Sequence, residues 1–273
     1  MTLTWHKKLV FYLLLIVSAF VLFAPAILAF LMSFMTSADT LTGKVIPSVW
    51  TFDNYIQAFQ RFPLLNYLFN SLLVSLAIMV GQLILSSLAA YAFVFLTFKG
   101  RDTLFFLFVA TMMIPFEASI IPNFQTIREL GLVNTYPGLT LPFFAMAFGT
   151  FLLRQTFKQI PVELKEASEI LGMGDFKFYL TVVLPMARTS LVTLGIYGFL
   201  TSWNMYLWPL LATTNDTVRT VQIGLKQLQS QETLNQWGVV MAGAVIVILP
   251  TLILLFLGQK KLQQGLAEGR LNK

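Results

Sequence analysis

Long runs of apolar residues, with few charged side chains inside them, recur along most of the chain. A helix needs about 20 residues to cross the hydrocarbon core of a bilayer, and six runs reach or approach that length. We therefore predict an all-α membrane protein with six transmembrane helices, and we treat residues 1–273 as a single transmembrane domain. The predicted spans lie at residues 9–34, 67–95, 103–124, 138–153, 191–212 and 237–258.

The composition also indicates that the solvent is lipid. Hydrophobic residues make up 57% of the chain and charged residues only 11%, with a mean hydropathy of +0.76, whereas soluble domains carry about 25% charged residues. A soluble chain of this length would expose much of its apolar surface to water. Cysteine is absent, which excludes disulfides and thiolate metal sites, and we predict neither a metal nor a cofactor.

Several prolines lie inside or at the ends of the predicted spans. Proline removes a backbone donor and bends or interrupts a helix. A bilayer tolerates this only where neighbouring helices or a water-lined cavity satisfy the freed groups, so the prolines favour a pathway over a passive bundle. They are Pro25, Pro115, Pro122, Pro142, Pro209 and Pro250.

The distribution of lysine and arginine predicts the orientation. If the amino terminus is cytoplasmic, thirteen of the 18 basic residues lie inside and five outside, which favours both termini in the cytoplasm. The first run is longer than the apolar core of a cleaved signal peptide, so we expect it to remain as an anchor. This distribution also accounts for the net charge of +6, so we predict no nucleic-acid partner. The largest cytoplasmic loop is then 154–188, and the outer loops are 35–66, 125–137 and 213–236.

The loop 154–188 contains a charged helix-turn-helix pattern. Pro161 suits the first turn of a helix, Glu163 and Glu166 complement its amino-terminal dipole, and Gly172 can supply the left-handed residue that ends it. The pattern predicts a helix of about three turns with an apolar face. A docking element for a soluble partner is the preferred interpretation, and an amphipathic helix on the lipid headgroups is the alternative.

A second short helix is predicted after the turn. Asp175 would be its cap, and Phe176, Phe178 and Tyr179 would lie along it until Pro185 leads into the fifth span.

The hairpin carries a motif that resembles a known family. Its spacing is Glu166-Ala167-Ser168, three residues, Gly172, nine residues, Val182, one residue and Leu184-Pro185. This resembles the cytoplasmic EAA loop of binding-protein-dependent ABC importer permeases, whose pattern is Glu-Ala-Ala, three residues, Gly, nine residues, Ile, one residue, Leu-Pro. Ser168 and Val182 are two conservative departures from that pattern.

The resemblance covers almost the whole chain. Six spans with both ends inside are similar to the smaller permease subunit of the carbohydrate-uptake group, which includes the maltose and sn-glycerol-3-phosphate importers. Residues 130–142 (LGLVNTYPGLTLP) look typical of that group. Residues 150–155 (TFLLRQ), residues 203–211 (WNMYLWPLL) and Thr189 are more similar to the glycerol-3-phosphate branch.

The resemblance implies a bacterial cell-membrane importer with several partners. A second permease subunit would form a heterodimer with this chain, two ATPase subunits would dock on the loop 154–188, and an extracytoplasmic substrate-binding protein would deliver the cargo. The cargo would be sn-glycerol-3-phosphate or a related glycerophosphodiester, with an oligosaccharide or sugar as the alternative. The coupling residues implied are Glu163, Glu166, Ala167, Ser168, Gly172, Leu184 and Pro185.

Each of these residues has an implied role. Glu166 would contact a basic or polar group of the ATPase, Ala167 and Ser168 would allow a close fit, and Gly172 would form the turn. Closure of the ATPase dimer would then switch the pathway between its two orientations.

The chain is not expected to be an enzyme. A phosphate-binding P-loop needs Gly, four residues, then Gly-Lys-Ser/Thr. The only Gly-Lys pair is Gly43-Lys44, followed by Val45. ATP hydrolysis would therefore belong to a partner subunit.

Four residues are candidates for the translocation path. Glu117 lies inside an apolar run, where a carboxylate normally faces a cavity or a partner, although it is interfacial if the third span ends near Pro115. Trp203, Asn204 and Tyr206 could offer aromatic faces and an amide to a polyol or sugar, although tryptophan and tyrosine are also common at membrane interfaces.

Two other classes of protein stay open. An ion-coupled secondary carrier should show paired intramembrane charges and two repeated halves with matching broken helices, and neither is evident in the sequence. A membrane scaffold would need no coupling hairpin.

Overall fold

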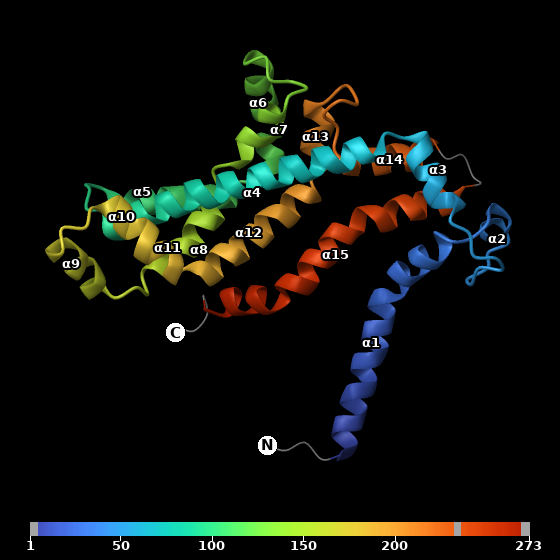
Figure 1. Cartoon of the computed structure of the whole chain (residues 1–273), viewed down its shortest axis with the longest axis horizontal. Coiled ribbons are helices and arrows are strands. Elements are labelled where there is room, and N and C mark those ends of the chain that lie inside the picture. Colours follow the sequence, from blue (N-terminus) through green and yellow to red (C-terminus); the bar gives the residue numbers. More distant parts are fainter. Residues whose placement is uncertain (1–4, 232–235, 269–273) are drawn as a thin grey trace. The chain divides into compact units, whose positions relative to one another are not determined.

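The computed structural model of the chain describes residues 5–231 and 236–268, and every regular element within them is a helix (Figure 1). The predicted all-α fold is confirmed. The helices divide into two compact units: Met1–Leu65 with Gly224–Leu249, and Asn66–Ile223 with Pro250–Lys273. Arg270 and Lys273, two of the charges behind the predicted orientation, lie outside the described residues.

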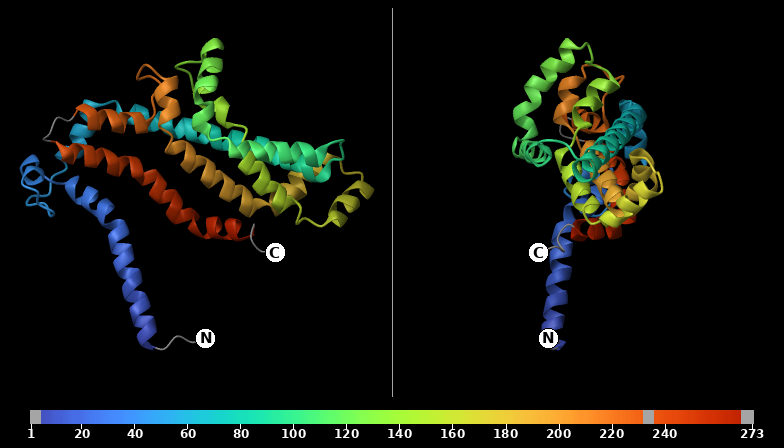
Figure 2. Two further views of the ribbon diagram at one scale, coloured as in Figure 1. Left: turned by 180° about the vertical axis from the view of Figure 1, so that it is seen from behind. Right: turned by 90° about the vertical axis from the view of Figure 1, so that its left-hand side faces the viewer.

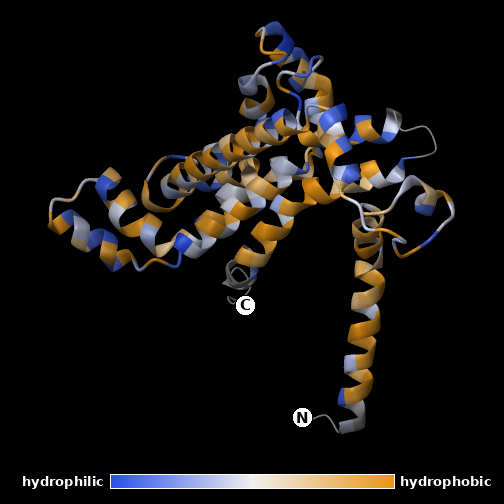
Figure 3. Cartoon of the chain, turned by 45° about the vertical axis from the view of Figure 1, so that its right-hand side comes forward, coloured by the Kyte–Doolittle hydropathy of each residue, from blue (hydrophilic) through white to orange (hydrophobic). Residues whose placement is uncertain are grey.

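The first unit contains α1, whose apolar surface is uncovered. None of the most apolar stretch of this helix is buried within the chain, and Figure 3 shows hydrophobic residues along nearly all of it. Such a helix is stable in lipid because its backbone groups are satisfied internally. The elements of this unit are α1 (Trp5–Met32), α2 (Ser37–Leu41), α3 (Asp53–Arg61) and the adjoining parts of α14 (Val221–Gln231) and α15 (Trp237–Glu268).

The second unit is arranged along α4 (Leu64–Phe95), beside which α8 and α12 run (Figures 1 and 2). Helices α9 and α10 lie at the carboxyl-terminal end of α4, and α13 lies toward its amino-terminal end. The further elements are α5 (Arg101–Ala110), η1 (Thr111–Met113), α6 (Phe116–Glu129), α7 (Tyr136–Thr140), η2 (Leu141–Phe143), α8 (Ala147–Phe157), α9 (Val162–Ile170), α10 (Asp175–Phe178), η3 (Tyr179–Val183), α11 (Leu184–Met186), α12 (Arg188–Trp203) and α13 (Leu207–Ala212).

Three of the six predicted spans are continuous helices in the described residues, and three are broken. Lys8–Met32, Leu64–Phe95 and Trp237–Gln259 are long and apolar enough to cross a membrane. Six spans result if each of three bent helix pairs also counts as one. The pairs are Arg101–Met113 with Phe116–Glu129 (100°), Tyr136–Phe143 with Ala147–Phe157 (48°) and Asp175–Met186 with Arg188–Trp203 (80°).

The structure shows where the third, fourth and fifth predicted spans are interrupted. The third breaks at Ile114 and Pro115, where proline provides no amide to continue the helix. The fourth breaks between η2 and α8. The predicted span 191–212 is two helices: α12 begins at Arg188 and ends at Trp203, and α13 runs from Leu207 to Ala212.

Two clusters of buried side chains hold the second unit together. One joins α4, α8, α10 and α12, with Leu153, Phe157 and Phe178 fully buried. The other surrounds Trp208, whose indole N–H donates to the carbonyl oxygen of Gly138 at 3.2 Å. Because lipid is as apolar as these side chains, close packing and hydrogen bonds hold such helices together more than exclusion of water does.

Polar side chains of α4 satisfy backbone groups at one helix break and in the segment after α13. Gln82 Nε2 donates to the carbonyl oxygen of Phe143 at 3.0 Å, at the break in the fourth span. Asn70 donates to the carbonyl oxygens of Thr217 and Arg219 at 3.0 and 2.9 Å. At the break in the fourth span, irregular backbone at membrane depth requires a partner of this kind.

Candidate functional site

Helix α9 is a short helix that ends in a well-formed turn. It spans Val162–Ile170 and is therefore somewhat shorter than predicted. Gly172 has φ +70°, as the sequence predicted. The amide of Gly172 donates to the carbonyl oxygen of Glu169 at 2.9 Å, and that of Met173 donates to Ser168 at 2.8 Å. These two bonds define a Schellman motif, which gives the turn a fixed direction.

The exposed surface of α9 combines acidic and apolar side chains. Glu163, Glu166 and Ala167 are exposed, and beside them Ile170 and Leu171 are 86% and 79% exposed. Ser168 is buried, and its hydroxyl donates to the carbonyl oxygen of Lys165 at 2.7 Å. Its small side chain therefore fits against this chain itself, whereas Ala167 is available to a partner.

Lys165 fixes the opposite side of α9 to α10. Its ammonium group lies 2.6 Å from a carboxylate oxygen of Asp175 and 2.9 Å from one of Glu169. The same group lies 5.5 Å from the ring centroid of Phe178. The hydrogen bond to Asp175 is the main reason why the pKa of Lys165 is raised above its ordinary value.

The second helix of the hairpin differs from the prediction. Gly174, not Asp175, is the N-cap of α10, and no side chain caps it. The Asp175 carboxylate instead accepts hydrogen bonds from Lys165 and from the hydroxyl of Tyr91 on α4. The sequence pattern allowed for a local cap but did not reveal these competing partners.

Pro185 does not end this helical run either. The run continues through the π-helical turn η3, with Leu184 half-buried and Pro185 exposed in the first turn of α11, and it breaks only after Met186. A proline is tolerated in a first turn because its missing amide has no acceptor there.

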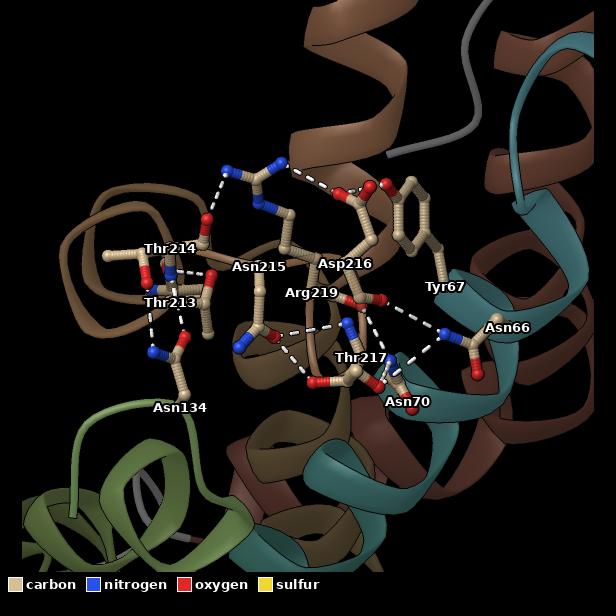
Figure 4. A network of polar contacts seen from close by, with 11 residues as sticks. Asn66, Tyr67, Asn70, Asn134, Thr213, Thr214, Asn215, Asp216, Thr217 and Arg219 are labelled. Carbon is tan, nitrogen blue, oxygen red and sulfur yellow. Dashed lines mark hydrogen bonds and ion pairs between the residues drawn. The ribbon is translucent and has the colours of Figure 1, made fainter.

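The other end of α4 carries a network of mainly neutral polar groups (Figure 4). Asn66 and Asn70 donate to backbone carbonyl oxygens of the segment after α13. Asp216 accepts from the Tyr67 hydroxyl at 2.8 Å and from Arg219 at 2.7 Å. The segment is thus fixed to α4 by side chains one turn apart. In the sequence, the only signal for this network was the spacing of Asn66 and Asn70 at the start of an apolar run.

Asn134 ties the turn between α6 and α7 to the same segment. It has φ +61°, a conformation that asparagine tolerates better than most residues. Its side chain donates to the Thr214 hydroxyl at 2.9 Å and accepts from the Thr214 amide at 2.7 Å.

The four translocation-path candidates lie at two helix breaks, the one at Pro115 and the one between α12 and α13. Glu117 is exposed in the first turn of α6, directly after the break at Pro115. Trp203 is buried and stacks on Phe199, with ring centroids 5.7 Å apart. Asn204 is exposed at the break after α12, and Tyr206 is half-buried just before α13. Of the three residues near this break, Asn204 is the one that is exposed.

Broken apolar helices together with a charged hairpin define the class of multi-span transport permeases. The chain belongs to the family described as the inner membrane component of binding-protein-dependent transport systems, whose model matches residues 82–267. The prediction of an ABC importer permease, made from the EAA-like loop, is confirmed.

Curated relatives cover nearly the whole chain. The sn-glycerol-3-phosphate transport system permease protein UgpE of Agrobacterium fabrum is 36% identical over 271 residues, which is 96% of each chain. The protein of the same name from Rhizobium meliloti is 35% identical over 272 residues, again 96% of each. The UgpE protein of Yersinia enterocolitica is 39% identical over 74% of this chain and 72% of its own.

A solved structure has the same fold. It is a chain of a bacterial ABC transporter involved in the import of the acidic polysaccharide alginate, with a TM-score of 0.87 and 24% sequence identity. The match covers 95% of this chain and 99% of that one.

Proposed function

We propose that this chain is the permease subunit of an ATP-driven importer for sn-glycerol-3-phosphate or a related glycerophosphodiester, and that α9 is the docking site of its ATPase subunits. The proposal for the docking site rests on one observation above all. Helix α9 is held by its own turn and by Lys165, yet it leaves Glu163, Glu166 and Ala167 uncovered. Membership of this family accounts for an uncovered, charged helix on a membrane protein. The names of the relatives support sn-glycerol-3-phosphate as the cargo.

The proposal includes further partners and an orientation. A second permease subunit would complete the membrane pathway, and an extracytoplasmic binding protein would deliver cargo at the amino-terminal end of α4. The distribution of basic residues supports an orientation with α9 and both termini in the cytoplasm. Asn204 and Glu117 are the proposed path residues, because both are exposed polar residues beside helix breaks.

Charge reversal on α9 tests the docking site. In cells that express the complete importer, Glu166→Lys should leave the amount of this subunit in the membrane unchanged and abolish uptake of radiolabelled sn-glycerol-3-phosphate. Gly172→Asp should do the same, because a side chain there is strained at φ +70° and adds charge to the docking surface.

Glu129→Lys is the matched control, since Glu129 is exposed at the end of α6. Normal uptake by the Glu166→Lys variant would refute the docking site. Competition of uptake by glycerophosphodiesters or by oligosaccharides would identify the cargo class, and uptake driven by an ion gradient without ATP would refute the importer.

A further inference from the structure

Asp175 joins two elements that the sequence separates widely. Its carboxylate lies 2.6 Å from the Lys165 ammonium group on α9. The Tyr91 hydroxyl on α4 donates to the same carboxylate oxygen at 3.2 Å and to the backbone carbonyl oxygen of Asp175 at 3.1 Å. A single residue thus connects the exposed helix of the hairpin to the longest helix of the second unit.

Lys165 is held more firmly than a surface lysine. Its side chain is only 13% exposed, and the ring of Phe178 below it is fully buried. Phe178 in turn contacts Phe95 of α4 edge to face, with centroids 5.5 Å apart. A lysine with this environment has few alternative rotamers, so a displacement of α9 carries its ammonium group and Asp175 along.

The segment after Asp175 is also fixed to α4. The Tyr179 hydroxyl and the Ser87 hydroxyl form a buried hydrogen bond of 2.7 Å, and the rings of Tyr179 and Tyr91 meet edge to face at 5.4 Å. Tyr179 begins the π-helical turn η3, and π-helical turns are frequent at functional sites. The junction therefore has one ionic contact toward α9 and two tyrosine contacts toward α4.

We propose that Asp175 is the positioning residue that transmits a displacement of α9 to α4. This inference rests on the proposed function, in which a partner engages α9. The Asp175 side chain is 55% exposed, but its carboxylate oxygen is engaged by Lys165 and Tyr91, so we assign it a role distinct from docking. Without its carboxylate, α9 would still bind the ATPase, but its movement would be transmitted poorly to the membrane helices.

Glu169 provides a matched control. Its carboxylate also pairs with Lys165, at 2.9 Å, but the two residues are four apart on the same helix. Glu169→Gln removes a carboxylate partner of Lys165 and leaves the connection from α9 to α4 intact. Any effect that comes only from loosening Lys165 should therefore appear equally in this variant.

The test uses the complete importer reconstituted in vesicles, with radiolabelled sn-glycerol-3-phosphate as the probe. Three quantities are measured: ATPase subunits co-purified with this chain, ATP hydrolysed, and probe taken up per ATP. Asp175→Asn and Tyr91→Phe should keep normal co-purification while uptake per ATP falls by about threefold to tenfold. Glu169→Gln should keep uptake per ATP at the wild-type level, whereas co-purification and ATP hydrolysis report separately any effect of this exposed residue of α9 on docking.

A charge exchange separates transmission from folding. Lys165→Asp combined with Asp175→Lys should recover most of the uptake per ATP that either single reversal loses. It is made in the Glu169→Gln background, because the introduced aspartate would otherwise face Glu169.

Three results would overturn the proposed role of Asp175. Uptake per ATP at the wild-type level in Asp175→Asn and Tyr91→Phe would overturn it. So would an equal loss in Glu169→Gln, or a charge exchange that performs no better than the single reversals. If no ATPase subunit co-purifies even with the wild-type chain, the proposed function fails instead, and the two failures are distinguishable.

Discussion

At the scale of single residues, glycines show which positions are fixed by packing and which by backbone conformation. A Cβ at Gly138 would collide with the carbonyl oxygen of Leu132, a backbone atom that cannot move aside easily. Gly172 has open space around it, and its requirement is the positive φ alone. Gly174 has neither constraint, since its φ is −67° and no atom lies within 4 Å of the added carbon.

Gly138→Ala should therefore destabilise the chain, and Gly174→Ala should not. The collision would shift α7 and weaken the hydrogen bond from Trp208 to the Gly138 carbonyl oxygen. Overpacking of this kind costs about 1–3 kcal/mol. Thermal unfolding of the purified protein in detergent measures the effect. An unfolding temperature for Gly138→Ala equal to that of Gly174→Ala would show that the turn at Leu132 yields without cost.

At the scale of elements, α2 is stabilised by one carboxylate. Asp39 accepts hydrogen bonds from Lys44 at 3.0 Å and from the hydroxyl and amide of Ser48 at 2.8 and 3.0 Å. Chiefly because of the Lys44 bond, the pKa of Asp39 is lowered from 3.8 to about 2. A lowered pKa means that the charged form stabilises the fold above about pH 4, and that this contribution is lost as the pH falls toward 2.

Hydrogen exchange of the amides at 39–48 should report this loss. Corrected for intrinsic rates, their protection should stay constant from pH 7 to about pH 5 and decrease between about pH 4 and pH 2. Asp39→Asn should show weaker protection already at neutral pH and little further change on acidification. The same acid transition in this variant would attribute the effect to another group.

The break in the fourth span depends on a distant side chain. Gln82 Nε2 donates to the Phe143 carbonyl oxygen, and Gln82→Leu would leave that oxygen without its donor. The expected cost is about 1–3 kcal/mol, again measured by thermal unfolding. Gln125→Leu on the exposed face of α6 is the control. Equal stability of the two variants would mean that another donor satisfies Phe143.

These examples show how far the sequence could predict the elements. Helices α4 and α15 follow from long apolar runs, and the end of α9 follows from Gly172, because these signals are local. The prolines indicated that spans would be interrupted. The positions of the breaks depend on Gln82, Trp208 and other partners far away in the chain, and hydropathy carries no information about such pairs. The role of Asp175 was missed for the same reason.

At the scale of the whole molecule, the two ends of α4 carry different chemistry. At one end, near Tyr91, α9 exposes acidic and apolar side chains. At the other, asparagines hold the segment after α13 and the turn between α6 and α7 (Figure 4). An importer needs such an asymmetry, because its energy source and its cargo arrive from opposite sides of the membrane.

The absence of cysteine makes this arrangement directly testable. Ile170→Cys and Leu130→Cys introduce thiols at positions that are 86% and 64% exposed, separated in sequence by the fourth span. A membrane-impermeant maleimide should label Leu130→Cys in intact cells whose outer membrane is permeable to the reagent. It should label Ile170→Cys only in inverted vesicles, because basic residues concentrate near α9. Labelling of both thiols from the same side would contradict a fourth span built from α7 and α8, and a reversed pattern would place α9 where no ATPase can reach it.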